Sequence, residues 1–304
     1  HKLTPRSSHF PDLSGGCCLV WGGEHMRQDG NKSLLGLRLG ARLGKYGEVG
    51  KLNLENHLIY ITDFLWRSLF LVIIVYIFLQ LWRAAYGSLG TDVVADYTLP
   101  EMLWYFMFAE TIVLSYPQLS RKIDDDVKQG SLAYALNKPY SYVLYQYATF
   151  ASEVALRTVV NGFVGSLVAL WAVKAVPVSV QGLPFLVISL LLSLTIQFCL
   201  VASIGLLAFW MEDTTSVWFI YQKFLFILGG MLLPLEVYPV ALQKVANALP
   251  MRYIVHGPAR LLVKFDLLKW WELTRGQLLW TLGLGIMAAG LYRMGVKQLN
   301  VNGG

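Results

Sequence analysis

The side chains that could carry out catalysis are few in this chain, and they do not form a catalytic set. The longest run of carboxylates, Asp124–Asp126, lies beside Arg121 and Lys122, which favours a solvated helix start over a metal site. His57 and His256 are isolated and far apart in the sequence. We therefore expect neither catalytic residues nor a metal centre.

The sequence also lacks the motifs of nucleotide chemistry. Gly30–Ser33 does not have the G-x-x-x-x-G-K-[ST] spacing of a P-loop, in which backbone amides and a lysine hold the phosphates of ATP. Cys17, Cys18 and Cys199 do not have the spacing of metal ligands. We expect the chain not to be an enzyme and to hold no cofactor of its own.

A long uncharged stretch decides the class of the protein. From Ala175 to Met211 the chain has no Asp, Glu, Lys or Arg, whereas a helix that crosses a bilayer needs only about 20 apolar residues. The whole chain is 56% hydrophobic and 14% charged, against about 25% charged residues in soluble domains. The sequence therefore predicts an all-α integral membrane protein.

Segments of suitable length and polarity predict six transmembrane helices. They span residues 64–86, 103–120, 150–173, 184–211, 216–235 and 273–292. Lysine and arginine gather before the first helix and after the second, as expected for the cytoplasmic side. An even number of crossings with both termini in the cytoplasm fits this bias. The net charge of +6 is spread over such helix ends, so we expect no nucleic-acid partner.

The sequence divides into three parts. Residues 1–25 contain no Met and no periodicity, so we interpret them as a non-native leader or an over-extended reading frame, with Met26 as the true initiator. Residues 26–60 form a cytoplasmic lead-in, whose interleaved leucines and basic residues suit an amphipathic helix in the membrane interface. Repeated glycines allow a frayed basic segment equally well. Residues 61–300 would form the six-helix domain.

The connection after the second helix is one of two informative segments. Residues 118–141 read QLSRKIDDDVKQGSLAYALNKPYS. The mixture of apolar and charged residues predicts a short cytoplasmic helix, a turn at Gly130 and an entry into the next helix set by Pro139. A soluble partner could accept the apolar side chains in a cleft while the charges set the register. A solvated loop that touches lipid headgroups is equally compatible with these residues.

The second informative segment, residues 228–262, follows the fifth helix. Gly229–Gly230 and Pro234 break that helix, while Pro239 and Pro250 enclose an amphipathic piece that is too short to span a membrane. Non-helical backbone at this depth must be covered by protein or water. We therefore predict a re-entrant or interfacial hairpin on the external side, before the sixth helix.

Taken together, these features resemble the permeases of the ABC-2 type, the membrane halves of ATP-driven exporters. The resemblance rests on the six helices, on D-x-x-x-x-x-G-S-L-A-Y-A-L-x-K-P from Asp124 to Pro139, and on G-G-M-x-x-P-x-E-x-Y-P…L-P from Gly229 to Pro250. It implies a coupling helix that docks on an ATPase. The residues assigned to this coupling are Ile123, Asp124, Val127, Gly130, Ser131, Leu132, Leu136 and Pro139. The residues assigned to the external hairpin are Gly229, Gly230, Pro234, Glu236, Pro239 and Pro250.

The resemblance also implies the partners of the chain. They are a separate ABC ATPase subunit, which binds ATP and Mg, and a second permease chain that is either identical or related. We expect this assembly in the bacterial cytoplasmic (inner) membrane, surrounded by lipid. The resemblance does not fix the substrate, for which we expect an amphipathic molecule.

The translocation path would lie between the two permeases, along the first, second and fifth helices. Its candidate residues are Phe108, Glu110, Tyr221, Lys223 and Phe224. The two charged residues would face protein or water and find a partner, and a structural role is at least as compatible with them as a substrate contact. The aromatic residues could equally face lipid.

Two other classes of function stay open. A secondary transporter would use ionisable residues near the membrane midplane. A non-transporting membrane scaffold would have no ATPase partner at all.

Overall fold

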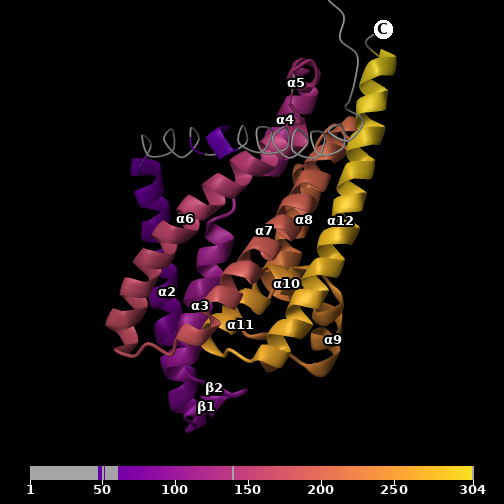
Figure 1. The fold of residues 1–304 in the computed structure, drawn as a ribbon. Helices are drawn as coiled ribbons and strands as arrows, with labels where there is room; N and C mark the ends of the chain where they lie inside the picture. The colour runs from indigo at the N-terminus through magenta and orange to yellow at the C-terminus, as the bar shows by residue number, and fades with distance from the viewer. Residues whose placement is uncertain (1–46, 50, 52–60, 139, 303–304) are drawn as a thin grey trace, which may run out of the picture. The chain divides into compact units, whose positions relative to one another are not determined.

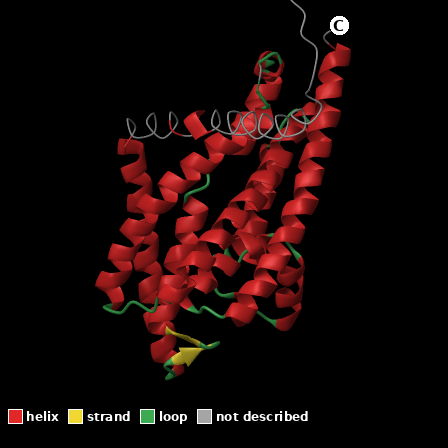
Figure 2. Cartoon of the chain, viewed as in Figure 1, coloured by secondary structure: helices red, strands yellow, loops and turns green. Residues whose placement is uncertain are grey.

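The computed structural model describes residues 47–49, 51, 61–138 and 140–302 (Figure 1). The predicted leader, nearly all of the lead-in and Pro139 lie outside the described residues. The described part is mostly helical (Figure 2), as predicted. Its helices are α2 (Ile61–Leu89), α3 (Leu99–Leu114), α4 (Leu119–Lys128), α5 (Ser131–Leu136), α6 (Tyr142–Val173), α7 (Leu183–Leu206), α8 (Thr215–Leu228), α9 (Val240–Ala248), α10 (Met251–Ile254), α11 (His256–Val263) and α12 (Leu267–Asn302). Short 3-10 turns lie at Val180–Gly182, Leu207–Phe209 and Leu235–Val237.

Four helical segments among the described residues are long and apolar enough to cross a membrane. They are Leu69–Leu89, Tyr142–Val173, Val180–Phe209 and Leu267–Gln298. The helices α3 and α8 have 16 and 14 residues. At about 1.5 Å per residue both are shorter than a hydrocarbon core of about 30 Å. Each predicted crossing thus corresponds to a helix, but length and composition support only four of the six.

Several predicted helix ends are wrong, because local breakers act before the apolar pattern stops. The second predicted helix ends at Leu114 rather than at residue 120, since Pro117 disfavours helical backbone before it and cannot donate a hydrogen bond. The fifth ends at Leu228, where Gly229 follows and Gly230 adopts a φ of 70°.

Other helices are longer than predicted. The helix α6 starts at Tyr142 instead of residue 150, and α12 covers Leu267–Asn302 instead of residues 273–292. Polar residues mark where the apolar stretch ends in the sequence. They do not end the helix, because no proline or glycine turn interrupts it there.

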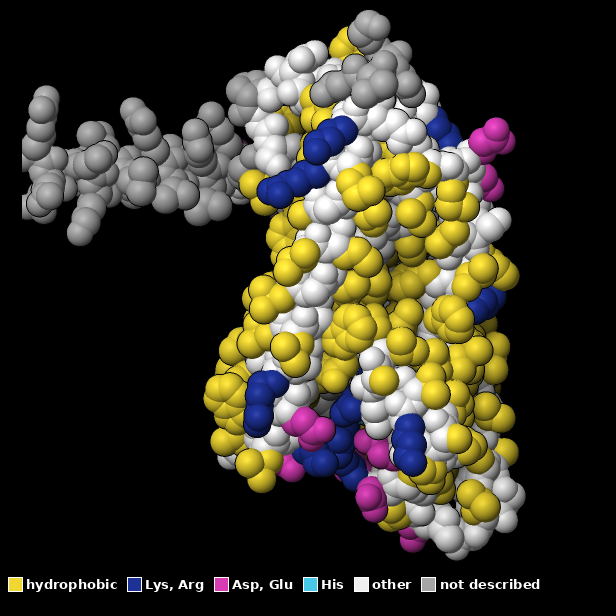
Figure 3. Space-filling view, turned by 90° about the vertical axis from the view of Figure 1, so that its right-hand side faces the viewer, with side chains coloured by type: hydrophobic (Ala, Val, Ile, Leu, Met, Phe, Trp, Pro, Cys, Tyr) yellow, Lys and Arg dark blue, Asp and Glu magenta, His cyan; other side chains and the backbone are white. Residues whose placement is uncertain are grey.

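The core of the described part is built around α3. Every residue of α3 from Met102 to Ile112 is buried, and the helix packs against α2, α6 and α11. Its close approach to α6 depends on Gly165, where a Cβ would lie 2.8 Å from the sulfur of Met107. Apolar side chains cover much of the face that Figure 3 shows, while most of its charged side chains lie towards the ends. This surface suits contact with lipid.

A short pair of strands was not predicted from the sequence. The strands β1 (Val93–Val94) and β2 (Tyr97–Thr98) pair antiparallel, with Val93 opposite Thr98. Between them Ala95 and Asp96 both have positive φ values, 48° and 69°, as in a two-residue type I′ turn. This small hairpin joins α2 to α3 at the end of the described part opposite α5 (Figure 1).

Candidate coupling hairpin and external segment

The helices α4 and α5 form a hairpin, here called the α4–α5 hairpin, that ends in a tight turn. The turn lies at Gly130, whose φ of 72° is left-handed and favours glycine. The prediction of a turn at Gly130 is therefore confirmed. In Figure 1 the tip of this hairpin lies at the same end as the C-terminal end of α12.

The base of the hairpin is pressed against α7. Gly205 in α7 permits this contact, because a Cβ there would come within 2.8 Å of both the Ser120 carbonyl oxygen and the Ile123 Cβ. The Ser120 carbonyl oxygen is a backbone atom, so it cannot move away by rotation of a side chain. The position of α4 is thus tied closely to that of a helix long enough to cross the membrane.

A single carboxylate joins three elements at the hairpin. Asp126 in α4 accepts hydrogen bonds from Ser131 Oγ at 2.9 Å, Tyr142 OH at 2.7 Å and Gln146 Nε2 at 3.1 Å. These donors come from α5 and from the first turns of α6. Bonds to an ionised group are among the stronger hydrogen bonds, so Asp126 fixes the hairpin against α6.

Asp126 was missed by sequence reasoning, which treated the whole carboxylate run as solvated. In the structure only Asp125 is exposed, and Asp124 is buried and pairs with Lys128 at 2.6 Å. That hydrogen bond raises the pKa of the Lys128 amine above its usual value. The local signal for Asp126 is the hydroxyl of Ser131 just past the glycine turn. Its partners on α6 cannot be read from spacing.

The predicted coupling residues divide into a buried and an exposed group. Ile123, Asp124 and Leu132 are buried, with Leu132 fully so, and they hold the hairpin in shape. They are therefore not available to a partner protein as the sequence suggested. Val127 and Gly130 are half-buried, and Ser131 and Leu136 are exposed. The largest exposed apolar side chain on the hairpin is Tyr134, which is 77% exposed.

The five candidate path residues do not come together within the chain. Phe108 and Glu110 in α3 are buried, and so is Tyr221 in α8, whose hydroxyl donates to Gln197 Oε1 in α7. Lys223 and Phe224 point to the outside of α8. Among the described residues, no ion pair joins Glu110 to Lys223.

Lys223 instead lies over an aromatic ring of its own helix. Its Nζ is 4.8 Å from the centroid of the exposed Phe219 ring. The outer face of α8 thus carries a cation and several exposed aromatic and aliphatic side chains. They are Phe219, Ile220, Phe224, Phe226 and Ile227.

The segment after α8, residues 229–263, folds back into the helical core. Pro239 and Pro250 enclose α9, as predicted, and α11 packs against α3 and α7. The backbone N–H of His256 donates to the Gly229 carbonyl at 3.0 Å, so the start of the segment lies against the first residue of α11. Pro234 precedes the 3-10 turn that contains Glu236.

Polar contacts fasten this segment to α3. The Tyr105 hydroxyl donates to the Gly230 carbonyl at 2.5 Å and lies 3.0 Å from His256 Nδ1. A Cβ on Gly230 would lie 3.0 Å from that same hydroxyl, so this position combines a tight contact with a left-handed backbone. On the other side of the imidazole, Glu236 Oε1 lies 3.4 Å from Arg260 Nε.

Comparison with known proteins identifies the family. The family model described as "ABC-2 family transporter protein" matches residues 69–303, which is most of the chain. The chain therefore belongs to the ABC-2 transporter family, and it is a multi-pass membrane permease of an ABC transporter, as the sequence motifs suggested. No curated protein matches it.

Proposed function

We propose that this chain is the permease of an ABC exporter, and that it couples ATP hydrolysis in a separate subunit to the movement of an amphipathic substrate. The observation that carries the proposal is the α4–α5 hairpin, a polar element held rigidly by Asp126 and Gly205 at one end of an apolar helical domain. ATP and Mg would bind to the partner ATPase. Such a partner is general for ABC-2 permeases.

The hairpin suits the transmission of movement, because its contacts lead into two long helices. A force on α5 would pass through Asp126 to α6 and through Ile123 to α7. Rigid elements of this kind shift as units, since packed interfaces deform little. The exposed side chains Tyr134 and Leu136 would contact the ATPase, while the buried predicted residues support them.

The proposed orientation puts the α4–α5 hairpin in the cytoplasm of a bacterium. The connection that contains the hairpin carries Arg121, Lys122, Lys128 and Lys138, and lysine and arginine are enriched in cytoplasmic connections. The C-terminal end of α12 lies at the same end and also carries basic residues. In this arrangement α3 and α8 complete six crossings, and residues 229–263 form the re-entrant external hairpin, covered by α3 and α7.

Two permease chains and two ATPases would make the working assembly. The exposed face of α8 is the part of the proposed interface that the described residues support best, because Phe224 is 50% exposed while Tyr221 on the same helix is buried. The path would therefore run beside Phe224 and Lys223. Phe108, Glu110 and Tyr221 would support it from inside the chain.

The coupling test compares two exposed tyrosines. We expect Tyr134→Ala to abolish most permease-dependent ATP hydrolysis in membranes that contain the permease and its ATPase, because the substitution removes the largest exposed apolar contact of the hairpin. Tyr76→Ala, which changes a 48% exposed tyrosine on α2, is the matched control and should leave hydrolysis unchanged. Equal hydrolysis in wild type and Tyr134→Ala would refute coupling through this hairpin.

The other classes of function predict different results in the same membranes. A secondary transporter would move its substrate on an ion gradient without the ATPase. A scaffold would show no permease-dependent hydrolysis with either variant. The family match favours the ATP-driven permease over both.

A further inference from the structure

A buried imidazole lies where residues 229–263 meet α3. His256, the first residue of α11, is only 3% exposed, and it is the one histidine in the described part of the chain. Its Nδ1 lies 3.0 Å from the Tyr105 hydroxyl, and its Nε2 lies 3.6 Å from Glu236 Oε1. Histidine is the side chain that ordinarily changes charge between pH 5 and 8, so these surroundings decide how the ring responds to acid.

The hydrogen bonds of Tyr105 determine which nitrogen of the ring carries a proton. The Tyr105 hydroxyl lies 2.5 Å from the Gly230 carbonyl oxygen, which can only accept, so the single hydroxyl proton is directed to that oxygen. The hydroxyl oxygen must then accept a hydrogen bond from His256 Nδ1. Neutral His256 therefore has its proton on Nδ1 and a lone pair on Nε2, the nitrogen that faces Glu236.

The closed arrangement disfavours a second proton on this ring. Protonation would put a full charge in a buried site, and burial is the main reason why the pKa of His256 lies well below its usual value. The cations of Arg252 in α10 and Arg260 in α11 lower that pKa further. Glu236 does not offset them, because 3.6 Å is too long for a hydrogen bond and the same oxygen lies 3.4 Å from Arg260 Nε.

The other titratable groups near α11 do not compensate for the two cations. The helix α7, which packs on α11, contains no Asp, Glu, Lys or Arg. Glu101 of α3 lies 3.9 Å from Lys264 and is paired with it. Burial raises the pKa of the Tyr97 and Tyr238 phenols, which keeps both neutral. The charged residues at the start of α12 are exposed; they are Lys269, Glu272 and Arg275.

Opening of residues 229–263 would remove the penalty on the protonated ring. Once the segment separates from α3, His256 is hydrated and binds a proton with its ordinary pKa of about 6.5. Opening would also hydrate Glu236 Oε2 and Arg252 Nε, two buried atoms without a hydrogen-bond partner among the described residues. Because the open segment binds the proton better than the closed one, protons shift the equilibrium towards the open segment.

We propose that residues 229–263 form a lid that acid opens, with His256 as its proton sensor. The closed lid has its full stability above about pH 7 and loses stability as the pH falls below about 6.5, where only the open lid takes up the proton. In the orientation proposed above, the lid would respond to acid outside the cell. Its opening requires neither the ATPase nor the cargo, so a failure here would leave the proposed coupling untouched.

The test is hydrogen exchange of the α11 amides in the purified full-length chain in detergent, between pH 5 and 8, corrected for the intrinsic exchange rate. We expect the opening constant of α11 to rise about twentyfold from pH 7 to pH 5, because opening takes up one proton. His256→Asn keeps an N–H donor near the Nδ1 position but cannot be protonated, so its opening constant should not change with pH.

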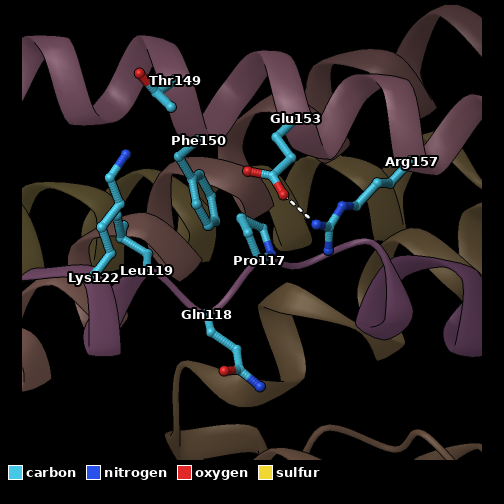
Figure 4. A pocket seen from close by; sticks show the side chains of 8 residues that line it. All are labelled: Pro117, Gln118, Leu119, Lys122, Thr149, Phe150, Glu153 and Arg157. Atoms are coloured by element: carbon cyan, nitrogen blue, oxygen red, sulfur yellow. Dashed lines mark hydrogen bonds and ion pairs between the residues drawn. The ribbon is translucent and has the colours of Figure 1, made fainter. Parts of the chain in front are cut away.

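The internal control is the first half of α6, residues 142–157, which lies at the α4–α5 hairpin and contains no histidine. Its charged residues Glu153 and Arg157 pair with each other (Figure 4). Exchange of its amides should not depend on pH after the same correction. An equal rise in opening of α6 and α11 would show general destabilisation by acid and would overturn the lid.

A second measurement does not depend on any variant. Exchange of the C2 hydrogen of the imidazole, followed by mass spectrometry, gives the pKa of His256 itself, which should lie well below 6.5. A value of 6.5 or above would overturn the proposal, and so would a constant opening of α11 from pH 7 to pH 5. An equal rise in His256→Asn would assign the response to other groups and reject His256 as the sensor.

Discussion

Asp126 is the residue on which the proposed coupling depends most. Replacing it with Asn keeps one carbonyl oxygen but removes the charge that strengthens its three hydrogen bonds. We expect Asp126→Asn to lower the free energy of local opening of α5 by about 1–3 kcal/mol. Hydrogen exchange of the α5 amides measures this value. Asp125 is exposed, so the neighbouring variant Asp125→Asn should leave the exchange of the α5 amides unchanged. A similar effect of both variants would contradict the role of Asp126.

Tyr105 joins elements at the other end of the described part, as Asp126 does at the α4–α5 hairpin. Its hydroxyl joins α3 to Gly230 and to His256. Tyr105→Phe should therefore loosen residues 229–263, with a loss of about 1–3 kcal/mol in the free energy of local opening. Hydrogen exchange of α11 reports the change. If α11 exchanges at the wild-type rate in this variant, the hydroxyl does not fasten the segment.

Residue types predicted the turn at Gly130 and the short helix α9 better than they predicted which side chains are in contact. Gly130, Pro239 and Pro250 act on the backbone next to them, so their effects could be inferred from sequence alone. The partners of Asp126 and the burial of Ile123 and Leu132 depend on where α6 and α7 lie in space. Sequence reasoning therefore assigned Ile123 and Leu132 to a partner surface, whereas the chain itself buries them.

At the scale of elements, the contact of α4 with α7 is the one that can be tested most simply. Gly205→Ala places a Cβ 2.8 Å from the Ser120 carbonyl oxygen, which forces the helices apart and should cost about 1–3 kcal/mol. We expect a lower Tm and weaker permease-dependent ATP hydrolysis. Gly283→Ala on α12 is the control, because nothing lies within 4 Å of the new Cβ. Wild-type behaviour of Gly205→Ala would contradict the tight contact.

Helices were recognised from sequence more reliably than their ends. Each of the six apolar segments proved to contain a helix, because continuous apolar residues leave few other ways to bury backbone polar groups. Their lengths were less predictable. Pro117 shortens α3, and the glycine pair shortens α8. The β1–β2 hairpin has only two residues in each strand, too few for an alternating pattern to be seen.

At the scale of the whole molecule, the proposed pairing of two permeases places α8 at their interface. A cysteine at Phe224 should form a crosslink between two chains in membranes, because this side chain is half exposed on the outer face of α8. A cysteine at Phe163, which is 66% exposed on α6, is the control and should not. If Phe224 is labelled only from lipid and never crosslinks under any nucleotide condition, the interface lies elsewhere.

The central claim is that the tip of the α4–α5 hairpin touches an ABC ATPase. A photoreactive amino acid at Tyr134, activated in intact cells, measures this contact directly because Tyr134 is the most exposed large apolar side chain on the hairpin. The account predicts a crosslinked species in which mass spectrometry identifies a polypeptide with a P-loop, and no such species when the label is at Tyr76. Crosslinks from Tyr134 to lipid alone, or to proteins without a P-loop, would contradict it.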